Sequence, residues 1–318
     1  MGKNEDLKNV IESNQNFVIY THINTDGDAL GSSFGFYRVL KQLGKNVDLF
    51  IDSPVPSSLS FLGIEEVLNK KTISKYDVVF SLDSGESDRL GKYEKDFYAV
   101  PNSVQIDHHR NNPNFAKLNF VSPDTSSTCE YIYKLIGEMG YKIDEKTAVC
   151  FLTGIMTDTG GLRFSNATKE TLFTVYDIVA KYNIDLSEIM SQIFETMDQE
   201  TFVTYKYAIN NTKFFDENKI AMIIVDNKFL TGNNIPLSAT KMLTRIGTEI
   251  KDVFYTVAIV EEKPNEYKVS FRGRKGKSVE SCARALGGGG HLYAAGCKLY
   301  GNIETVKEKI LKAIRDEM

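Results

Sequence analysis

The chain reads Phe17-Val-Ile-Tyr-Thr-His-Ile-Asn-Thr-Asp-Gly-Asp28 near its N-terminus, so that a short apolar run passes directly into imidazole and acid side chains. Short apolar runs rich in Val, Ile and aromatic residues are typical of β-strands. In an open α/β sheet, the residues that follow a strand lie at its carboxyl end, where these folds collect ligands. The segment therefore predicts a strand that delivers polar side chains to a binding site.

Three more segments place acid or imidazole groups directly after apolar residues: Phe80-Ser-Leu-Asp83, Gln105-Ile-Asp107-His108-His109 and Ile155-Met-Thr-Asp158. The runs 76–80 and 103–106 predict strands, whereas the run 147–156 predicts a buried helix. Carboxylates and imidazoles without cysteine suit octahedral cations such as Mn²⁺ or Mg²⁺ better than a thiolate zinc site. Together, the segments predict a metal site.

Each of these acidic residues has a simpler interpretation when it is taken alone. An Asp at the end of an apolar run is commonly a helix N-cap or a turn residue, which applies to Asp83 and Asp158. Asp28 could cap a predicted helix at 29–43 in the same way. The combination argues against this interpretation, because the segment 22–28 holds three potential ligands in one turn, with a glycine that permits tight folding.

These motifs resemble those of the DHH phosphoesterases. The chain carries His22-Ile-Asn-Thr-Asp-Gly-Asp-Ala-Leu-Gly-Ser32 for the family's HxNPDGDAxGS, with Thr25 in place of the usual proline, followed by Asp83, Asp107-His108-His109 and Asp158. Near the C-terminus, Gly288-Gly-Gly-His-Leu-Tyr-Ala-Ala-Gly296 resembles the GGGHxxAAG motif of the companion DHHA1 domain. The resemblance spans nearly the whole chain and is strongest to the branch of small nanoRNases and pAp phosphatases.

The resemblance implies two divalent cations, with Mn²⁺ favoured and Mg²⁺ as the alternative. The implied ligands are His22, Asp26 and Asp83 for one ion, and Asp28, Asp83, His108 and Asp158 for the other. Asp83 would then bridge the ions, which would activate a water for attack on phosphorus. The implied catalytic residues are Asp83 and His109, the latter to contact the scissile phosphate or protonate the leaving oxygen. The alternative for His109 is a core histidine bonded to backbone.

A second signal is the glycine run 287–290, which follows a predicted helix at 279–286. Ordered glycines lose backbone entropy, about 0.5–1 kcal/mol at each position. We interpret the run as a loop whose N–H groups approach a phosphate, with a flexible hinge as the alternative. By analogy with the family, the predicted substrate-binding residues are Arg272, Gly288, Gly289, Gly290 and His291, with Arg274 and Arg163 as weaker candidates.

Composition limits the class of protein. The 318 residues carry a net charge of −4 and no tryptophan, whereas proteins that track along nucleic-acid polymers need extended basic surface and stacking aromatics. No apolar stretch is long enough to span a bilayer, and the N-terminus lacks the core of a signal peptide. We therefore expect a cytoplasmic protein with no membrane partner and no long duplex nucleic acid as partner.

The order of predicted elements indicates an α/β protein of two domains. In the first half, strands alternate with helices at 29–43, 128–139 and 169–182, as a parallel sheet requires. The range 186–214 is predicted to be helical, and the second half to hold a strand at 219–225, a helix at 238–250, a hairpin at 253–271 and a helix at 303–314. We expect a mainly parallel metal-binding domain at 1–190, a helical linker at 191–215 and a smaller α/β substrate-binding domain at 216–318, facing the first across a cleft.

The resulting hypothesis is a two-metal phosphoesterase that hydrolyses short 5′-phosphorylated oligonucleotides (nanoRNA) to mononucleotides and dephosphorylates pAp. Hydrolysis of cyclic di-AMP or pApA is the main alternative. A pyrophosphatase would share the catalytic motifs, but its second domain lacks the glycine–histidine motif. A metal-stabilised nucleotide sensor without turnover is disfavoured by the intact ligand set. The expected partners are thus short oligonucleotides or nucleotides, and a homodimer is compatible with the sequence.

Overall fold

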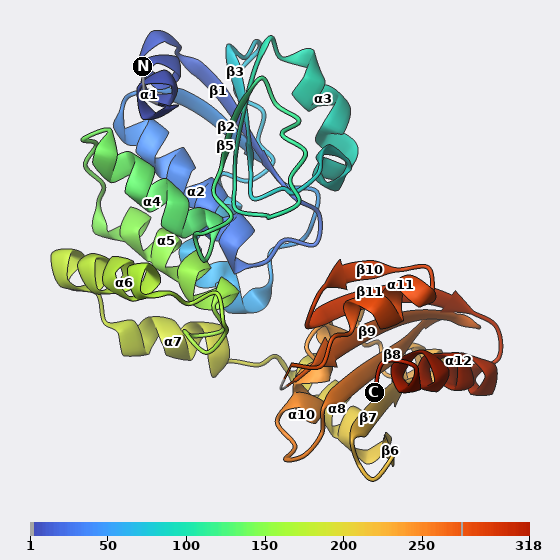
Figure 1. Cartoon of the computed structure of the whole chain (residues 1–318). Helices are drawn as coiled ribbons and strands as arrows, with labels where there is room; N and C mark the ends of the chain where they lie inside the picture. The colour runs from blue at the N-terminus through green and yellow to red at the C-terminus, as the bar shows by residue number, and fades with distance from the viewer. Residues whose placement is uncertain (1–2, 275) are drawn as a thin grey trace. The chain divides into compact units, whose positions relative to one another are not determined.

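The structure is a computed structural model that describes residues 3–274 and 276–318. It divides into two compact units, Met1–Thr196 and Met197–Met318, each with its own sheet and core (Figure 1). This confirms the predicted α/β class with two sheets. Among the described residues, no helix is long and apolar enough to cross a membrane.

The first unit is built on a five-stranded parallel sheet with strand order β2-β1-β3-β4-β5. Because β1 lies between β2 and β3, the order of strands reverses beside it, and ligands bind α/β sheets at such a reversal. The predicted strands at 17–20, 76–80 and 103–106 correspond to β1, β3 and β4. The strands are β1 (Asn16–Thr21), β2 (Asn46–Phe50), β3 (Val78–Leu82), β4 (Asn102–Asp107) and β5 (Leu118–Val121).

Helices cover both faces of this sheet, as Figure 1 shows. The larger core joins side chains of β1, β3 and β4 to the helices on one face. On the opposite face, α3 (Glu94–Ala99) contributes Phe97 to a smaller cluster. The helices of the larger core are α1 (Lys3–Ser13), α2 (Gly27–Gln42), α4 (Thr128–Glu138), α5 (Glu145–Asp158), α6 (Lys169–Tyr182) and α7 (Leu186–Phe194).

Helices α2 and α5 pack closely against each other, and this packing brings two acidic residues of the predicted metal site together. A Cβ atom at Gly31 would lie 2.4 Å from the carbonyl oxygen of Cys150, and one at Gly27 would lie 2.3 Å from Oγ1 of Thr157. Only glycine permits α2 and α5 to approach so closely at these two positions. As a result, Asp28 at the start of α2 and Asp158 at the end of α5 are brought to the same end of the unit.

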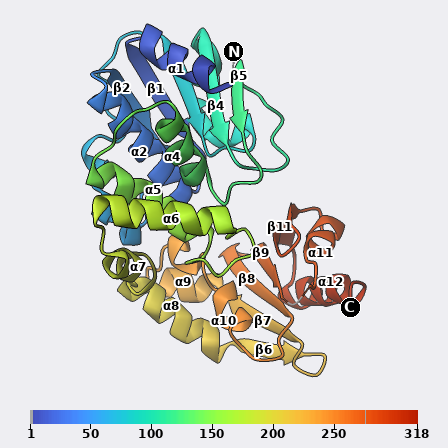
Figure 2. The same ribbon diagram turned by 60° about the vertical axis from the view of Figure 1, so that its left-hand side comes forward.

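The second unit contains a six-stranded mixed sheet with strand order β10-β11-β9-β8-β7-β6. Strands β7 and β8 pair in parallel, and the other neighbours are antiparallel. Figure 2 shows α11 and α12 on one face and α8 and α10 on the other, and each face has its own core. The strands are β6 (Thr212–Phe215), β7 (Ile220–Val225), β8 (Tyr255–Lys263), β9 (Glu266–Gly273), β10 (Gly289–His291) and β11 (Ala294–Tyr300). The helices are α8 (Gln199–Asn210), α9 (Asn227–Gly232), α10 (Thr244–Thr248), α11 (Glu280–Ala285) and α12 (Ile303–Arg315).

Two segments predicted to be continuous helices are divided into shorter elements in the structure. The range 186–214 holds α7, a new helix α8 capped by the Asp198 side chain on Thr201 N–H, and the edge strand β6. The division between the units falls after Thr196, inside the range expected to be a linker. The range 238–250 holds a short 3₁₀ turn, Leu237–Thr240, and the short α10. Threonine hydroxyls bond backward to carbonyls there, as Thr240 does to Leu237, and this competes with a continuous helix.

Candidate metal centre

The carboxyl ends of β1, β3 and β4 meet at one edge of the first sheet. His22 follows β1, Asp83 follows β3, and His108 and His109 follow β4. Asp83 has a φ of 56°, a left-handed conformation that Asp tolerates better than most residues. This turn directs the residue away from the strand path at the point where the parallel strands end. The predicted segments thus converge in space.

Three of these side chains form a first group of potential ligands, His22, Asp26 and Asp83. The Nε2 atom of His22 lies 3.8 Å from Oδ1 of Asp26 and 3.5 Å from Oδ2 of Asp83. The Nδ1 atom of His22 lies 2.8 Å from the Ile23 carbonyl oxygen, which can only accept a hydrogen bond. Nδ1 therefore carries a proton, and Nε2 is the ring nitrogen that faces the two carboxylates.

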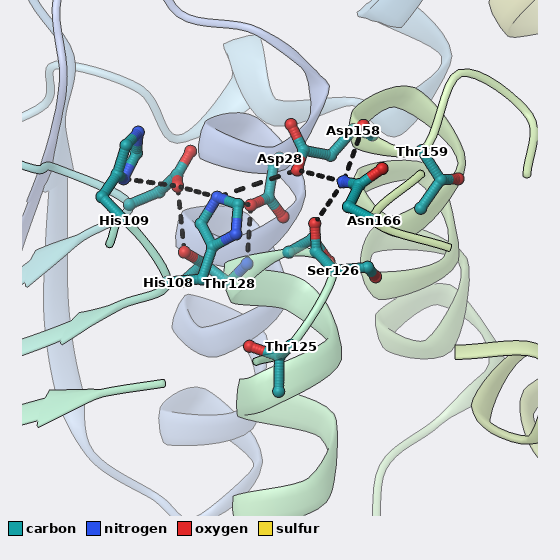
Figure 3. Close-up of polar contacts among 12 residues, drawn as sticks. Asp28, His108, His109, Thr125, Ser126, Thr128, Asp158, Thr159 and Asn166 are labelled. Atoms are coloured by element: carbon teal, nitrogen blue, oxygen red, sulfur yellow. Dashed lines mark hydrogen bonds and ion pairs between the residues drawn. The ribbon is translucent and has the colours of Figure 1, made fainter. Parts of the chain in front are cut away.

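A second group consists of Asp28, His108 and Asp158. The Nε2 atom of His108 lies 3.8 Å from Oδ2 of Asp28, 3.7 Å from Oδ2 of Asp158 and 3.7 Å from Oδ1 of Asp83. Figure 3 shows His108 beside Asp28 and Asp158. The ring nitrogen thus contacts all three acids, which come from α2, α5 and the loop after β3.

Asp83 contacts both groups with different oxygens. Its Oδ2 faces His22, whereas its Oδ1 faces His108 and accepts a hydrogen bond of 2.9 Å from Oγ1 of Thr128. Ligands about 2.1 Å from an octahedral cation are about 3 Å apart when adjacent and about 4.2 Å apart when opposite. The separations of 3.5 to 3.8 Å in both groups lie between these two values, so shifts of less than about 1 Å would bring each group to the spacing of a hard divalent cation.

Asp28 is held by the start of helix α4. Its two carboxylate oxygens accept hydrogen bonds from the backbone N–H groups of Thr128 and Cys129, at 2.7 and 2.9 Å. The suggestion that Asp28 caps the helix at 29–43 is wrong, because the N-cap is Asp26, whose side chain accepts from the N–H groups of Asp28 and Ala29. With its cap role taken by Asp26, Asp28 is 1% exposed and points into the site.

The electrostatics of the cluster favour a cation. Burial and then the charge of Asp83 raise the pKa of Asp28 well above its usual value, and the same causes raise that of Asp158. Burial lowers the pKa of His22, but hydrogen bonds to Asp26 and Asp83 outweigh it and raise this pKa to about 10. Converging carboxylates that repel one another are stabilised by protons or by metal ions. The donor set and its charge therefore fit divalent cations.

His109 is held by Asp107, and its Nδ1 also lies 4.0 Å from Oδ1 of Asp83, with which it and His108 form a third group of potential ligands. Its Nδ1 lies 2.8 Å from Oδ1 of Asp107, and Oδ2 of the same carboxylate accepts from the His109 N–H and from Nδ2 of Asn112. Burial lowers the pKa of His109, but the bond to Asp107 and the charge of Asp83 raise it to about 9. Figure 3 shows the other ring nitrogen directed away from the carboxylates, so it is left for a different partner.

Sequence reasoning missed the residues that position these side chains. Thr128 contacts Asp83, and Asn166 bridges the site from the loop that follows α5. Nδ2 of Asn166 donates to the carbonyl oxygens of Ser126 and Asp158, at 3.0 and 3.2 Å, and lies 3.4 Å from Oδ2 of Asp158 (Figure 3). These contacts fix the end of α5. Thr128 at the start of α4 and Asn166 in a loop belong to no motif or apolar pattern from which to infer these contacts.

Replacing Asn166 by alanine should weaken metal binding at the group that contains Asp158. Residues that orient a ligand typically change metal affinity about 10- to 100-fold. Titration with Mn²⁺, monitored by calorimetry, would measure the loss of metal affinity. Asn102→Ala is a matched control, because Nδ2 of Asn102 bonds to the Asp77 carbonyl oxygen at the opposite, amino end of β4. Equal affinities for the two variants would contradict a positioning role for Asn166.

The predicted substrate residues of the second unit lie around strands β9, β10 and β11. Arg272 on β9 pairs with Ala294 on β11, which pairs in turn with His291 on β10, so the three backbone positions form one row. The side chain of His291 lies outside the described part of the structure. Nη1 of Arg274 donates to the carbonyl oxygens of Thr248, the last residue of α10, and of Ile250, so this end of the guanidinium group holds the end of α10.

Arg163 lies in the first unit, in the loop after α5. Its Nε donates to the carbonyl oxygen of Gly160, and its guanidinium group lies 5.7 Å from the ring centroid of Phe194. The residue is therefore held by its own loop and by α7. It remains a candidate for substrate contact because the residue as a whole is exposed.

The glycine run is only partly a loop, because Gly289 and Gly290 belong to edge strand β10. Gly287 has a φ of 79°. A Cβ atom at Gly288 would lie 2.1 Å from the Gly296 carbonyl oxygen, and one at Gly290 would lie 2.6 Å from that of Ala294. At Gly289, by contrast, no described atom lies within 4 Å of an added Cβ. Folding therefore explains three of the glycines and leaves Gly289 without a structural reason.

Alanine at Gly288 and at Gly289 should have different effects. Gly288→Ala should destabilise the second unit by about 1–3 kcal/mol, the usual result of overpacking. Gly289→Ala should leave the melting temperature unchanged and raise KM, because its methyl group would obstruct a ligand that approaches the strand. Gly232→Ala in α9, where an added Cβ also meets no described atom within 4 Å, is the control. A wild-type KM for Gly289→Ala would limit the run to a structural role.

Comparisons with known proteins show the family of the chain. Residues 16–155 match the model of the DHH family, N-terminal domain, and residues 222–318 match that of the DHHA1 domain. The chain is 31% identical over 312 residues to the bifunctional oligoribonuclease and PAP phosphatase NrnA of Thermus thermophilus, an alignment that covers 94% of this chain and 89% of that protein. The chain belongs to the DHH family, and it is an enzyme of the phosphoesterase type.

Two further relatives support this assignment. The bifunctional oligoribonuclease and PAP phosphatase NrnA of Bacillus subtilis is 29% identical over 288 residues, covering 89% of each chain. The crystal structure of an exopolyphosphatase-related protein from Bacteroides fragilis is 26% identical, with a TM-score of 0.91 over 99% of this chain and 96% of that one. The likeness to known members therefore extends over both units.

Proposed function

We propose that the chain is a two-metal phosphoesterase that hydrolyses short 5′-phosphorylated oligonucleotides to mononucleotides and dephosphorylates pAp. The observation that carries the proposal is the position of Asp83, whose two oxygens face two separate groups of ligands. Among the relatives, those from Thermus thermophilus and Bacillus subtilis are named oligoribonuclease and PAP phosphatase. Mn²⁺ is the proposed ion, with Mg²⁺ as the alternative.

Each residue of the site has a proposed role. His22, Asp26 and Asp83 would hold one cation, and Asp28, Asp83, His108 and Asp158 the other. Such a pair of cations activates water and stabilises negative charge on a phosphoryl group. His109, held at Nδ1 by Asp107, would present Nε2 to the substrate phosphate or to the leaving oxygen. A protonated His109 would serve as the donor, which agrees with its raised pKa of about 9.

The second unit is the proposed source of substrate binding. Arg272 lies on β9, beside Ala294 and thus one strand away from the glycine run. Gly289 leaves its edge of the sheet open to a ligand, because an added Cβ there would meet no described atom within 4 Å. Arginine and exposed backbone N–H groups both bind phosphate oxygens. We therefore propose that 216–318 holds phosphates of the substrate and 1–190 cleaves it, with 191–215 between them and a cytoplasmic location.

The composition of the chain bears on the length of the proposed substrate. The net charge of −4 and the lack of tryptophan disfavour a long single strand as substrate. Catalytic efficiency should therefore decrease as a 5′-phosphorylated RNA is lengthened from a dinucleotide. Cyclic di-AMP or pApA is the second candidate substrate, since it presents the same phosphodiester chemistry.

One experiment tests the proposed function directly. The purified protein with Mn²⁺ is incubated with pAp, pApA, cyclic di-AMP, 5′-labelled RNAs of increasing length and pyrophosphate, and initial rates are compared. We expect the highest efficiencies on pAp and the shortest RNAs. Equal or processive degradation of the longest RNA would contradict the short-substrate proposal. Turnover of pyrophosphate alone would contradict the nucleotide proposal, and turnover of none would favour the sensor.

A further inference from the structure

Arg89 lies beside the metal centre, in the segment that follows β3. It belongs to the 3₁₀ segment Ser87–Tyr93, and its carbonyl oxygen accepts a hydrogen bond of 2.7 Å from the N–H of Ile23, the residue after His22. The next residue, Leu90, is fully buried in the smaller core of the first unit. Backbone and core contacts therefore hold Arg89 next to His22 and do not depend on what its side chain binds.

The half-buried side chain of Arg89 lacks the acceptor that a guanidinium group requires. Its Nη2 lies 3.3 Å from Nδ1 of His22. That ring nitrogen carries a proton, which it directs to the Ile23 carbonyl oxygen at 2.8 Å, so it cannot also accept a hydrogen bond from Arg89. Within 3–274 and 276–318, no carboxylate or carbonyl oxygen bonds to this guanidinium group. Other arginines pair with a carboxylate: Arg38 with Asp144, Arg245 with Glu249, Arg284 with Glu280 and Arg315 with Asp216.

The loop that leads to Arg89 connects His109 with His22. A Cβ atom added at Gly85 would lie 3.2 Å from Cγ of His109, whereas Arg89 at the end of the loop contacts His22. The charge of Arg89 also reaches His109: burial lowers the pKa of His109, the hydrogen bond to Asp107 raises it, and the positive charge of Arg89 again lowers it. The Arg89 side chain is therefore within reach of both the first group of ligands and His109.

The chemistry of a guanidinium group selects the kind of ligand. Its N–H groups form a planar fork that binds two oxygens of a phosphate or carboxylate at once. The carboxylates of the metal centre are the proposed ligands of the cations, which leaves an anion from outside the chain as the partner of Arg89. Arginine does not release its proton in proteins. Arg89 can therefore hold phosphate oxygens, whereas protonation of a leaving oxygen is left to His109.

We propose that Arg89 binds the phosphoryl group of the substrate beside His22 and His109, so that the first unit holds the group that it cleaves. This assignment rests on the proposed function, since it takes a phosphoester as the ligand. It adds a positively charged residue of the first unit to those proposed in 216–318. A group that is preorganised to contact phosphoryl oxygens stabilises the negative charge on them during the reaction.

Inorganic phosphate, titrated by calorimetry into the full chain saturated with Mg²⁺, tests the assignment without turnover. Arg89→Ala should weaken phosphate binding about 10- to 100-fold, as expected for the loss of hydrogen bonds to a charged group. Arg89→Lys should recover part of this affinity, because lysine keeps the charge without the planar fork. Arg38→Ala is the matched control: Arg38 lies about 15 Å from Asp28 along α2 and pairs with Asp144, so phosphate affinity should not change.

The number and affinity of bound Mn²⁺ ions distinguish phosphate binding from mere support of His22. Both should be the same in the wild type and in Arg89→Ala, because the backbone bond from Ile23 is retained. Phosphate binding by Arg89→Ala that equals that of the wild type would overturn the assignment, as would loss of an ion from this variant. A wild type that binds phosphate through Arg89 yet cleaves none of the nucleotides would support the assignment and contradict the proposed function.

Discussion

Replacing Asp83 by asparagine should reduce kcat at least about a thousandfold while the fold stays intact. Asparagine has the same shape and tolerates the left-handed backbone that Asp83 adopts, with a φ of 56°. Asparagine lacks the negative charge of the carboxylate that would bind both cations. Its amide oxygen could still bind one cation, but its NH2 group can only donate hydrogen bonds. A thousandfold loss corresponds to about 4 kcal/mol, within the several kcal/mol that metal ions contribute to transition-state charge stabilisation.

The measurement is kcat on pAp together with the number of bound Mn²⁺ ions per chain. Asp83→Asn, and likewise Asp83→Ala, should bind fewer than two ions. Asp185→Asn is a matched control, because Asp185 is the N-cap of α7 and asparagine caps helices equally well. Substantial turnover by Asp83→Asn with two ions bound would remove Asp83 from its proposed bridging role.

The sequence predicts the frame of the first unit well, because local patterns determine it. The apolar spacing of residues 169–182 corresponds to α6, and the runs before His22 and Asp83 correspond to β1 and β3. Parallel strands end at a common edge, so polar residues after successive strands must lie near one another. This argument brings segments together that are far apart in the chain, without any knowledge of side-chain contacts.

The remaining features depend on contacts that no local pattern records. Thr128 reaches Asp83 across 45 positions of sequence, and Asp28 accepts from the start of α4 across 100. Such contacts follow from the packing of α2, α4 and α5. In the same way, the strand at Gly289 and Gly290 depends on its pairing with β11, and β6 on its pairing with β7. Glycine-rich and polar segments predict loops until a partner strand is known.

Removal of divalent cations should lower the melting temperature of the first unit by roughly 5 to 10 °C for each ion lost. An ion at a hundred times its dissociation constant stabilises the folded state by about 2.7 kcal/mol, and 1 kcal/mol shifts the melting temperature of a unit of this size by about 2–4 °C. Without cations, Asp28 and Asp83 remain buried, at 1 and 2% exposure, and their charges repel.

Calorimetry of the full chain with EDTA and then with excess Mn²⁺ measures this shift, and the second unit supplies an internal control. Every proposed ligand lies in Met1–Thr196, so the transition of Met197–Met318 should not move. In Asp83→Asn the shift should shrink, since the variant binds fewer ions. If neither EDTA nor Mn²⁺ changes the melting temperature, a metal site at these residues is contradicted, because any cation that binds only the folded state must stabilise it.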